Sequence, residues 1–354
     1  MKTLDVGLIG FGLGGRSFHA PVINAVPGLR LAAILQRSGD SAAQLYPHAR
    51  IVRTLDELLA IDSIRLIAIS TPNQTHFSLA QRCLEAGRHV VVDKPFTTTV
   101  AEAVTLLEFA QQKKLVLSVY HNRRFDADFQ ALRQNIAAGA LGRVLRFEST
   151  YDRFRPSPKP GAWREQPGPG SGILYDLAPH LIDQAMTLLG TPQALSADVR
   201  TERHNISTDD AFDIFLYYPQ GVRALLRATM MSANPRPRLV VLGEKGSYLK
   251  REFDPLEPTL REGKVPTGSS WVVEKEENFG ELTLVESGVT TTGKIPSTGD
   301  WREFYVNVRD AILSSVPLLV THQQALNVMV ALELAQESSS KRCAIPWQSV
   351  TASA

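Results

Sequence analysis

Residues 6–16 read VGLIGFGLGGR, and this stretch decides the fold. A run of apolar residues leads directly into Gly10-x-Gly12-x-x-Gly15, and a helical pattern follows over residues 18–25. A strand that enters a helix through this glycine spacing brings backbone N–H groups around a pyrophosphate at the helix N-terminus. The first glycine permits the tight turn, the second leaves room for the cofactor, and the third lets the helix pack against the strand. The stretch therefore predicts dinucleotide binding rather than an ordinary tight turn.

Strand and helix patterns alternate through the first third of the chain. Short, nearly continuous apolar strands are predicted at residues 4–9, 29–35, 66–70, 90–92 and 115–119, with helices at residues 55–59, 75–85 and 100–111. Such strands, separated by helices, indicate a parallel sheet that is covered on both faces. We therefore predict an α/β fold whose residues 1–120 form a Rossmann domain with a doubly wound parallel sheet.

The pattern changes near Tyr120, and residues 121–354 are predicted to form a second α/β domain. Longer strands with alternating polarity are expected at residues 143–150, 194–200, 211–218, 222–230 and 238–243, and they indicate a large, mostly antiparallel open sheet. One helix is expected at residues 176–189, and two more at residues 301–313 and 322–338. The polar region over residues 254–299 is expected to hold loops and a hairpin.

The composition is that of an ordinary globular protein. The chain has 354 residues, a formal net charge of +2 and 44% hydrophobic residues, which gives no reason to expect nucleic-acid or membrane partners. No apolar run approaches the roughly 20 residues of a membrane-spanning helix, and the glycines after the first strand are not typical of a signal peptide. Two cysteines, Cys83 and Cys343, form neither a disulfide framework nor a metal-site spacing. We expect a reduced, cytoplasmic compartment.

The end of the second predicted strand indicates which nicotinamide cofactor is bound. An acidic residue at this place accepts hydrogen bonds from the ribose 2′-OH of NAD and repels the 2′-phosphate of NADP. The chain has Gln36, Arg37 and Ser38 there, and no acid before Asp40. Arg37 can pair with a phosphate and Ser38 can donate to it, although a solvated arginine at a strand end is the alternative. The sequence predicts NADP, with NAD as the second choice.

Lys94 is the first candidate for a catalytic residue. It follows three consecutive valines and Asp93, so it lies at the carboxyl end of a buried strand, where open α/β sheets bind ligands. Pro95 ends the strand and is a candidate for a cis peptide bond. A buried ammonium there can polarise a substrate oxygen. The alternative is a lysine that leaves the strand for solvent.

Asp176 and His180 are the second candidate site. Their spacing of four places them on one face of a helix. Because proline is tolerated in the first turn of a helix, Pro179 predicts that this helix begins close to Asp176, as its N-cap. His180 would then lie near the positive end of the helix dipole, which favours a neutral imidazole that can accept a proton. A capping aspartate beside a core histidine is the alternative reading.

A metal site built from Asp176, His180 and Asp183 is also possible at this spacing. No further cluster of histidines or cysteines supports it, so we predict no metal.

The motifs together resemble those of the Gfo/Idh/MocA family of oxidoreductases. The resemblance rests on five segments that span nearly the whole chain: Gly10-x-Gly12-x-x-Gly15, Thr71-Pro72-Asn73-x-x-His76, Asp93-Lys94-Pro95, Gly170-x-Gly172-x-x-x-Asp176-x-x-x-His180-x-x-Asp183 and Trp301-Arg302-x-Phe304-Tyr305. Other segments are most similar to an NADP-dependent branch that includes scyllo-inositol dehydrogenases. Asp93 is a departure, because most members of the family have a glutamate there, and we assign it no catalytic task.

The resemblance implies hydride transfer between a nicotinamide and a CH–OH group of a sugar, polyol or inositol. Lys94 would polarise the reacting oxygen, His180 would be the acid or base, and Asp176 would orient His180. A polyhydroxylated small molecule is the expected partner, together with further copies of the chain, since in this family the open sheet commonly mediates dimer or tetramer formation.

Two sets of contact residues are predicted. The cofactor-binding set is Gly10, Phe11, Gly12, Leu13, Gly15, Arg16, Arg37, Ser38, Thr71, Pro72, Asn73, His76, Lys94 and Asn122. The substrate-binding set is Lys94, Tyr120, Tyr151, Arg153, Trp163, Asp176 and His180, with His121 and Arg155 as further candidates. For the aromatic residues, packing at a domain junction is the alternative role.

Two other functions fit parts of the pattern. The first is an NAD-dependent glycosidase that oxidises its substrate transiently before elimination. Such an enzyme would favour an acid at the end of the second strand, where the chain has Arg37. The second is a non-catalytic sensor that binds the nucleotide and would be free to lose the pair Lys94 and His180, both of which are present.

Overall fold

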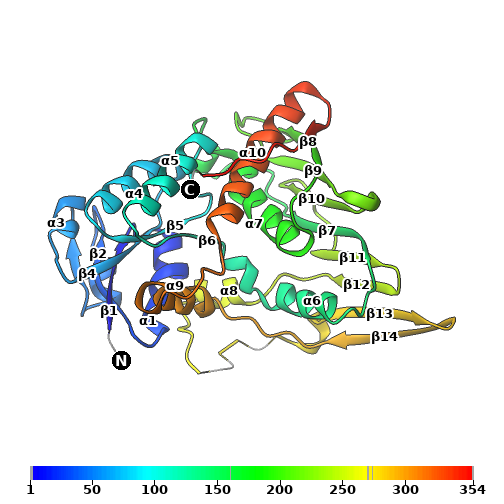
Figure 1. The fold of residues 1–354 in the computed structure, drawn as a ribbon, viewed down its shortest axis with the longest axis horizontal. Coiled ribbons are helices and arrows are strands. Elements are labelled where there is room, and N and C mark those ends of the chain that lie inside the picture. The colour runs from blue at the N-terminus through cyan, green and yellow to red at the C-terminus, as the bar shows by residue number, and fades with distance from the viewer. Residues whose placement is uncertain (1–2, 160, 269–270, 273, 353–354) are drawn as a thin grey trace.

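A computed structural model describes residues 3–159, 161–268, 271–272 and 274–352. Its first sheet has six parallel strands (Figure 1). In spatial order these are β3 (Arg50–Val52), β2 (Leu29–Leu35), β1 (Leu4–Ile9), β4 (Ile64–Ile69), β5 (His89–Asp93) and β6 (Leu117–Tyr120). The order reverses at β1, which pairs with both β2 and β4, so the carboxyl end of β1 lies at a topological switch point. The doubly wound parallel sheet is confirmed.

Helices cover both faces of this sheet, as Figure 1 shows. They are α1 (Ala20–Ala25), α2 (Ser41–Leu45), α3 (Leu55–Leu59), α4 (His76–Glu85), α5 (Val100–Gln112) and α9 (Arg302–Ser314). Strand β5 illustrates why its sequence is apolar throughout. Val90 and Val92 belong to the cluster with α4 and α5, whereas Val91 between them packs in the cluster with α1 and α9. A strand that is buried on both faces cannot alternate in polarity.

The second sheet has nine strands and is mostly antiparallel, as predicted. In spatial order they are β14 (Val289–Ile295), β13 (Gly280–Glu286), β12 (Gly246–Lys250), β11 (Leu239–Gly243), β7 (Val144–Asp152), β10 (Arg223–Thr229), β9 (Ala211–Tyr217), β8 (Ala194–Arg200) and β15 (Ile345–Pro346). Only the pair β7 and β10 is parallel among the strand pairs described. Strands β13 and β14 form the hairpin expected in the polar region and extend away from the body of the molecule (Figure 1).

One face of the second sheet is covered by helices and the other is open. The helices of this half are α6 (Ala127–Ala137), α7 (Gly172–Leu189), α8 (Leu256–Arg261) and α10 (His322–Lys341), of which α7 and α10 lie against the sheet (Figure 1). In β9, Ile214 and Leu216 are buried in the core below these helices. Phe215 between them points to the opposite side, where it is 37% exposed. In the part of the chain that the structure describes, no helix is long and apolar enough to cross a membrane.

Several elements differ from the prediction. The structure contains β3, β12, β15, α2, α6 and α8, which we did not predict; apart from the start of α7, the other strand and helix boundaries coincide with the prediction or shift by one to three residues. These additions are short or, for α6, lie where the chain passes from one sheet to the other.

The predicted start of α7 is wrong. The helix begins at Gly172, so Pro179 lies inside it and His180 is its ninth residue. Asp176 is not the cap. Instead the carboxylate of Asp209, which precedes β9, accepts a hydrogen bond of 2.7 Å from the backbone N–H of Leu174. Because the helix dipole acts mainly over the first turn, it does not account for a neutral His180.

Candidate active site

The glycine turn after β1 has the shape that the cofactor requires. Gly10 has a φ of +94°, and a Cβ there would overlap the carbonyl oxygen of Ser70 at the end of β4. A Cβ at Gly15 would overlap the carbonyl oxygen of Gly10. A Cβ at Gly12 would meet nothing within 4 Å among the described residues, so its missing side chain leaves open space on the outer side of the turn. Gly10 and Gly15 therefore serve the turn itself, and Gly12 leaves a cradle that fits a pyrophosphate.

The other residues predicted near this turn lie around its rim. Leu13 is 46% exposed, and the backbone N–H of Arg16 donates to the carbonyl of Gly12 at 2.9 Å. The ring of Phe11 packs edge-on against Tyr46, with the ring centroids 6.0 Å apart. From Gly14 to His19 the chain forms a π-helical turn, η1, rather than the start of the α-helix that we predicted, and α1 follows it.

The end of β2 carries two exposed polar side chains. Arg37 and Ser38 have no hydrogen-bond or ion-pair partner among the described residues. Asp40, the first acid after β2, is bound by Arg53 at 2.9 Å. Arg53 also donates to the carbonyls of Gln36 and Gly39 and so fixes the loop. The one carboxylate near this strand end is already neutralised, whereas the guanidinium of Arg37 is available to an anion.

The segment after β4 braces the site from below. Both ring nitrogens of His76 face backbone carbonyls, that of Pro95 at 2.8 Å and that of Thr71 at 3.0 Å. Asn73, which follows Pro72 in a short 3-10 turn, donates to the carbonyl of Gly170 at 2.6 Å. The cofactor-binding predictions for Asn73 and His76 thus fall on side chains that already hold the segment after β5 and the segment before α7 in place.

Lys94 lies where the two sheets meet. It follows β5, and the peptide bond between Lys94 and Pro95 is cis, as the sequence indicated. Its ammonium donates to the backbone carbonyl of Asp176 at 2.5 Å and lies 3.1 Å from the carboxylate of the same residue. The two side chains are only 12% and 25% exposed. Lys94 does not leave the strand for solvent, because Asp176 of α7 holds it at the junction.

Asp176 is held ionised by three cations. Burial alone would raise the pKa of Asp176, but Lys94, Arg164 and Arg153 outweigh it and lower the pKa. Arg164 lies 3.1 Å from the carboxylate. Burial lowers the pKa of Lys94, although the charge of Asp176 opposes that shift. No hydrogen bond joins Asp176 and His180 in the described structure, where the carboxylate contacts Lys94 and Arg164.

His180 is buried and lacks a partner. Its Nδ1 atom makes no hydrogen bond to any described residue. Burial, followed by the positive charges of Lys94 and Arg123, holds the pKa of His180 well below its ordinary value. The ring is therefore neutral at physiological pH, as we predicted, but because of burial and neighbouring cations rather than the helix dipole.

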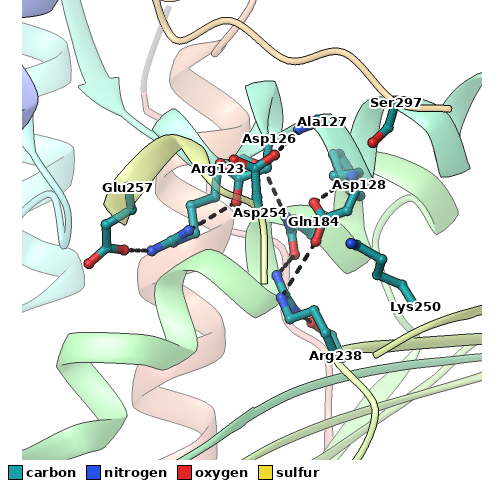
Figure 2. A network of polar contacts seen from close by, with 12 residues as sticks. Arg123, Asp126, Ala127, Asp128, Gln184, Arg238, Lys250, Asp254, Glu257 and Ser297 are labelled. Atoms are coloured by element: carbon teal, nitrogen blue, oxygen red, sulfur yellow. Dashed lines mark hydrogen bonds and ion pairs between the residues drawn. The ribbon is translucent and has the colours of Figure 1, made fainter. Parts of the chain in front are cut away.

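A buried polar network links Arg123, Gln184 and Arg238 (Figure 2). Arg123 contacts Asp126 at 3.0 Å and also Glu257 of α8. Gln184, one turn after His180 on α7, accepts from Arg238 at 2.8 Å and donates to the carbonyl of Arg123 at 2.9 Å. Arg123 and Arg238 lie close enough to His180 to disfavour a positive charge on its ring.

Some predicted substrate contacts have free polar atoms at this site. Both ring nitrogens of His121 and the hydroxyl of Tyr151 are buried without partners in the described part of the chain. Arg153 faces Tyr151, with its guanidinium 5.9 Å from the ring centroid, and it has no ion-pair partner among the described residues. Buried polar atoms without partners are uncommon, and a bound ligand is one explanation.

Other predicted contacts are less available. Tyr120 lies in an aromatic cluster, and its hydroxyl donates to the carbonyl of Phe18 at 3.0 Å. Trp163 is half-buried beneath Arg164, and Arg155 is exposed. Asn122 is buried in the 3-10 turn after β6.

Sequence reasoning missed Arg123 and Arg164 as determinants of the site. Arg123 follows Asn122, and Arg164 lies in a polar loop with no recognisable motif. Asp183, considered as a metal ligand, is held by two hydrogen bonds from Arg124. No cluster of three or more His, Cys, Asp or Glu side chains that could hold a metal ion occurs among the described residues.

A glycine turn at a topological switch point, beside a buried lysine, defines an NAD(P)-dependent oxidoreductase. Residues 4–121 match the family model for the oxidoreductase family with an NAD-binding Rossmann fold, and residues 129–249 match the GFO/IDH/MocA C-terminal domain. The chain belongs to the Gfo/Idh/MocA family of oxidoreductases.

Relatives match the chain over nearly its whole length. The oxidoreductase YdgJ of Escherichia coli is 41% identical, over 97% of this chain and 98% of that protein. The NADP-dependent scyllo-inositol 2-dehydrogenase IolW of Bacillus subtilis is 34% identical, over 97% of this chain and 95% of that protein. Among solved structures, an oxidoreductase from Yersinia pestis is 40% identical with a TM-score of 0.93, and it covers 99% of both chains.

The burial of His121 predicts a loss of stability in acid. Burial lowers the pKa of His121 from 6.5 to about 4, so below pH 6.5 the unfolded chain binds a proton that the folded chain does not. This group alone lowers the free energy of unfolding by up to about 1.4 kcal/mol per pH unit between those values. In urea unfolding from pH 7 to pH 4.5, H121Q should show a shallower decline than the unaltered chain. Exposed His204 supplies the control, and equal declines in H121Q and H204Q would contradict the assignment.

Proposed function

We propose that the protein is an NADP-dependent dehydrogenase or reductase acting on a CH–OH group of a sugar, polyol or inositol. Residues 1–120 would bind the cofactor, and residues 121–354 would hold the substrate and the oligomer interface. The observation that carries the proposal is the pairing of a buried, held lysine with a neutral, unpartnered histidine at the carboxyl ends of the parallel strands. The relation to IolW supports the substrate class and the cofactor.

The reacting oxygen would lie between Lys94 and His180. When bound, the nicotinamide takes up or supplies the hydride at the substrate carbon. The ammonium of Lys94 donates to the oxygen and lowers the cost of negative charge that develops there. His180, being neutral, accepts the hydroxyl proton during oxidation and returns it during reduction. Burial strengthens both interactions, because water does not screen them.

Asp176 would act on Lys94 rather than on His180. Its carboxylate and its backbone carbonyl both accept from the ammonium, so the side chain of Lys94 is fixed in direction. Its negative charge opposes the lowering of the pKa of Lys94 that burial causes. The free atoms of His121, Tyr151 and Arg153 would then bind the other hydroxyl groups of the substrate and set its pose.

The end of β2 supports NADP. Arg37 and Ser38 are exposed and have no partner within the described part of the chain, and Asp40 is already paired with Arg53. An NAD-dependent glycosidase would favour a free acid at this place, and a sensor would not need Lys94 and His180 in their buried arrangement. We therefore rank both alternatives below the dehydrogenase.

We also propose that two or four copies of the chain assemble through the open face of the second sheet. Phe215 and Leu242 are exposed on it, and charged residues such as Arg227 and Asp213 are already paired within the face. Exposed apolar residues of this kind mark interaction surfaces. Light scattering on the full chain should give the mass of two or four copies, and F215R should lower it. A single-copy mass for the unaltered chain would contradict this proposal.

A substitution of Lys94 tests the proposed catalytic mechanism. Replacing it by methionine removes the ammonium but keeps much of the stem, so kcat should fall by about 10²-fold or more, while NADPH binding measured by cofactor fluorescence persists. The assay follows NADP⁺ reduction against inositols, aldoses and sugar acids. K341M, at a lysine exposed near the end of α10, is the control. Full activity of K94M on an active substrate would reject the mechanism.

A substitution of Arg37 tests the proposed preference for NADP over NAD. R37A should raise the KM for NADP⁺ by about 10- to 100-fold, since one charge-assisted contact to a phosphate is lost, and should leave the KM for NAD⁺ nearly unchanged. R50A, at an exposed arginine of neighbouring β3, should alter neither. An equal effect of R37A on both cofactors would show that Arg37 does not read the 2′-phosphate.

A further inference from the structure

We infer that His19 and Tyr305, acting through Asp93, form a buried positioning chain that couples the cofactor-binding turn to Lys94. The inference rests on the proposed function of Lys94. The chain draws on three distant parts of the sequence: η1 after the glycine turn, the last residue of β5, and α9. We assigned none of these three residues to the site from sequence.

The contacts lead from α9 to β5, and the step between His19 and Asp93 is an electrostatic contact longer than a hydrogen bond. His19 and Tyr305 are both fully buried, and Nδ1 of His19 lies 2.6 Å from the hydroxyl of Tyr305. Nε2 of His19 lies 3.6 Å from Oδ2 of Asp93 and has no other partner among the described residues. A proton on Nε2 would face the carboxylate, and Nδ1 would then accept from Tyr305, so one tautomer serves both contacts. The ring of Tyr120 packs on the other side, with its centroid 4.4 Å from that of His19.

Asp93 joins this chain to both functional elements. Its Oδ1 accepts from the backbone N–H of Lys94 at 2.8 Å, and its Oδ2 accepts from the hydroxyl of Ser70 at 3.2 Å. A Cβ at Gly14 would lie 2.5 Å from the hydroxyl of Ser70 and 3.2 Å from Oδ2 of Asp93. Gly14 thus packs closely against Ser70 and Asp93, and the carboxylate of Asp93 also fixes the backbone of Lys94.

The carboxylate of Asp93 is charged in the folded protein. Burial would raise its pKa, but His19, Lys94 and His76 outweigh burial and lower the pKa to about 2. That charge favours the protonated form of Lys94, as does Asp176, whereas burial and Arg164 oppose it. His121 and His180 also face Lys94, and Tyr120 and Tyr305 face Asp93.

A purely structural role accounts poorly for this arrangement. A buried carboxylate and imidazole must lose their hydration, and well-packed apolar groups of similar size are often as stable or more stable. The surrounding side chains are aromatic and could close around apolar residues. What the polar chain supplies and an apolar one cannot is a fixed negative charge below the turn, at the residue next to Lys94.

The pH dependence of kcat/KM distinguishes the proposed positioning role of this chain from a purely structural role. Loss of the Lys94 proton ends activity at high pH, so D93N, which removes the negative charge, should move the alkaline limb down by about one pH unit. H19Q should raise the KM for the cofactor by about 10-fold and lower kcat, because the turn and Lys94 lose their link. Y305F leaves the side chains of His19 and Asp93 in place, so it should raise the KM for the cofactor and lower kcat by less than H19Q does.

H89Q is the matched control. His89 is buried at the opposite end of β5 and accepts from the backbone N–H of Val116, so its loss lowers stability without touching the site. If D93N, H19Q and Y305F lose only stability, as H89Q does, and keep the alkaline limb and cofactor KM, the inference is overturned. If D93N does not fold, the cofactor KM and kcat of Y305F and H19Q still test the inference. Wild-type turnover by K94M would instead overturn the proposed function itself.

Discussion

The buried contact between Lys94 and Asp176 is the interaction on which the site depends. It joins the carboxyl end of β5 in the first sheet to α7, which covers the second sheet. Removing one partner from a buried ion pair leaves an uncompensated charge and typically costs about 3–5 kcal/mol. The pair therefore does more than place an ammonium. It joins the two halves at the point where the parallel strands end.

The charges around this pair determine the protonation states of the neighbouring groups. Lys94, Arg153 and Arg164 act on Asp176, and Lys94 and Arg123 act on His180. These positive charges favour an ionised carboxylate and a neutral histidine at the same time. A proton acceptor and a proton-bearing ammonium can therefore stand side by side at neutral pH. The helix dipole is not needed for this, and the position of His180 in the middle of α7 excludes it.

Periodicity and strand ends could be read from the sequence, whereas long-range partners could not. The apolar runs of the first sheet and the position of Lys94 after β5 follow from local residue patterns, and they are confirmed. The start of α7 was misplaced because this helix tolerates Pro179 in its interior. Its N-terminal backbone is also bound by the side chain of Asp209, which is distant in the sequence. Nor did the sequence show which side chains contact Asp176. Arg164 reaches it from a loop that no motif marks.

The division between paired and unpaired atoms separates scaffold from ligand-facing groups. His76, Asn73 and Asp183 were all candidates from motif spacing, yet each is engaged with backbone or arginine partners. His180 and His121 are equally buried and have free ring atoms. Burying an unpaired polar atom costs about 1–3 kcal/mol, so a folded chain rarely retains several of them in one place without use. A hydroxylated substrate would satisfy these atoms. Because they are unpaired in the free protein, the site would then favour ligands that present hydroxyl groups at those positions.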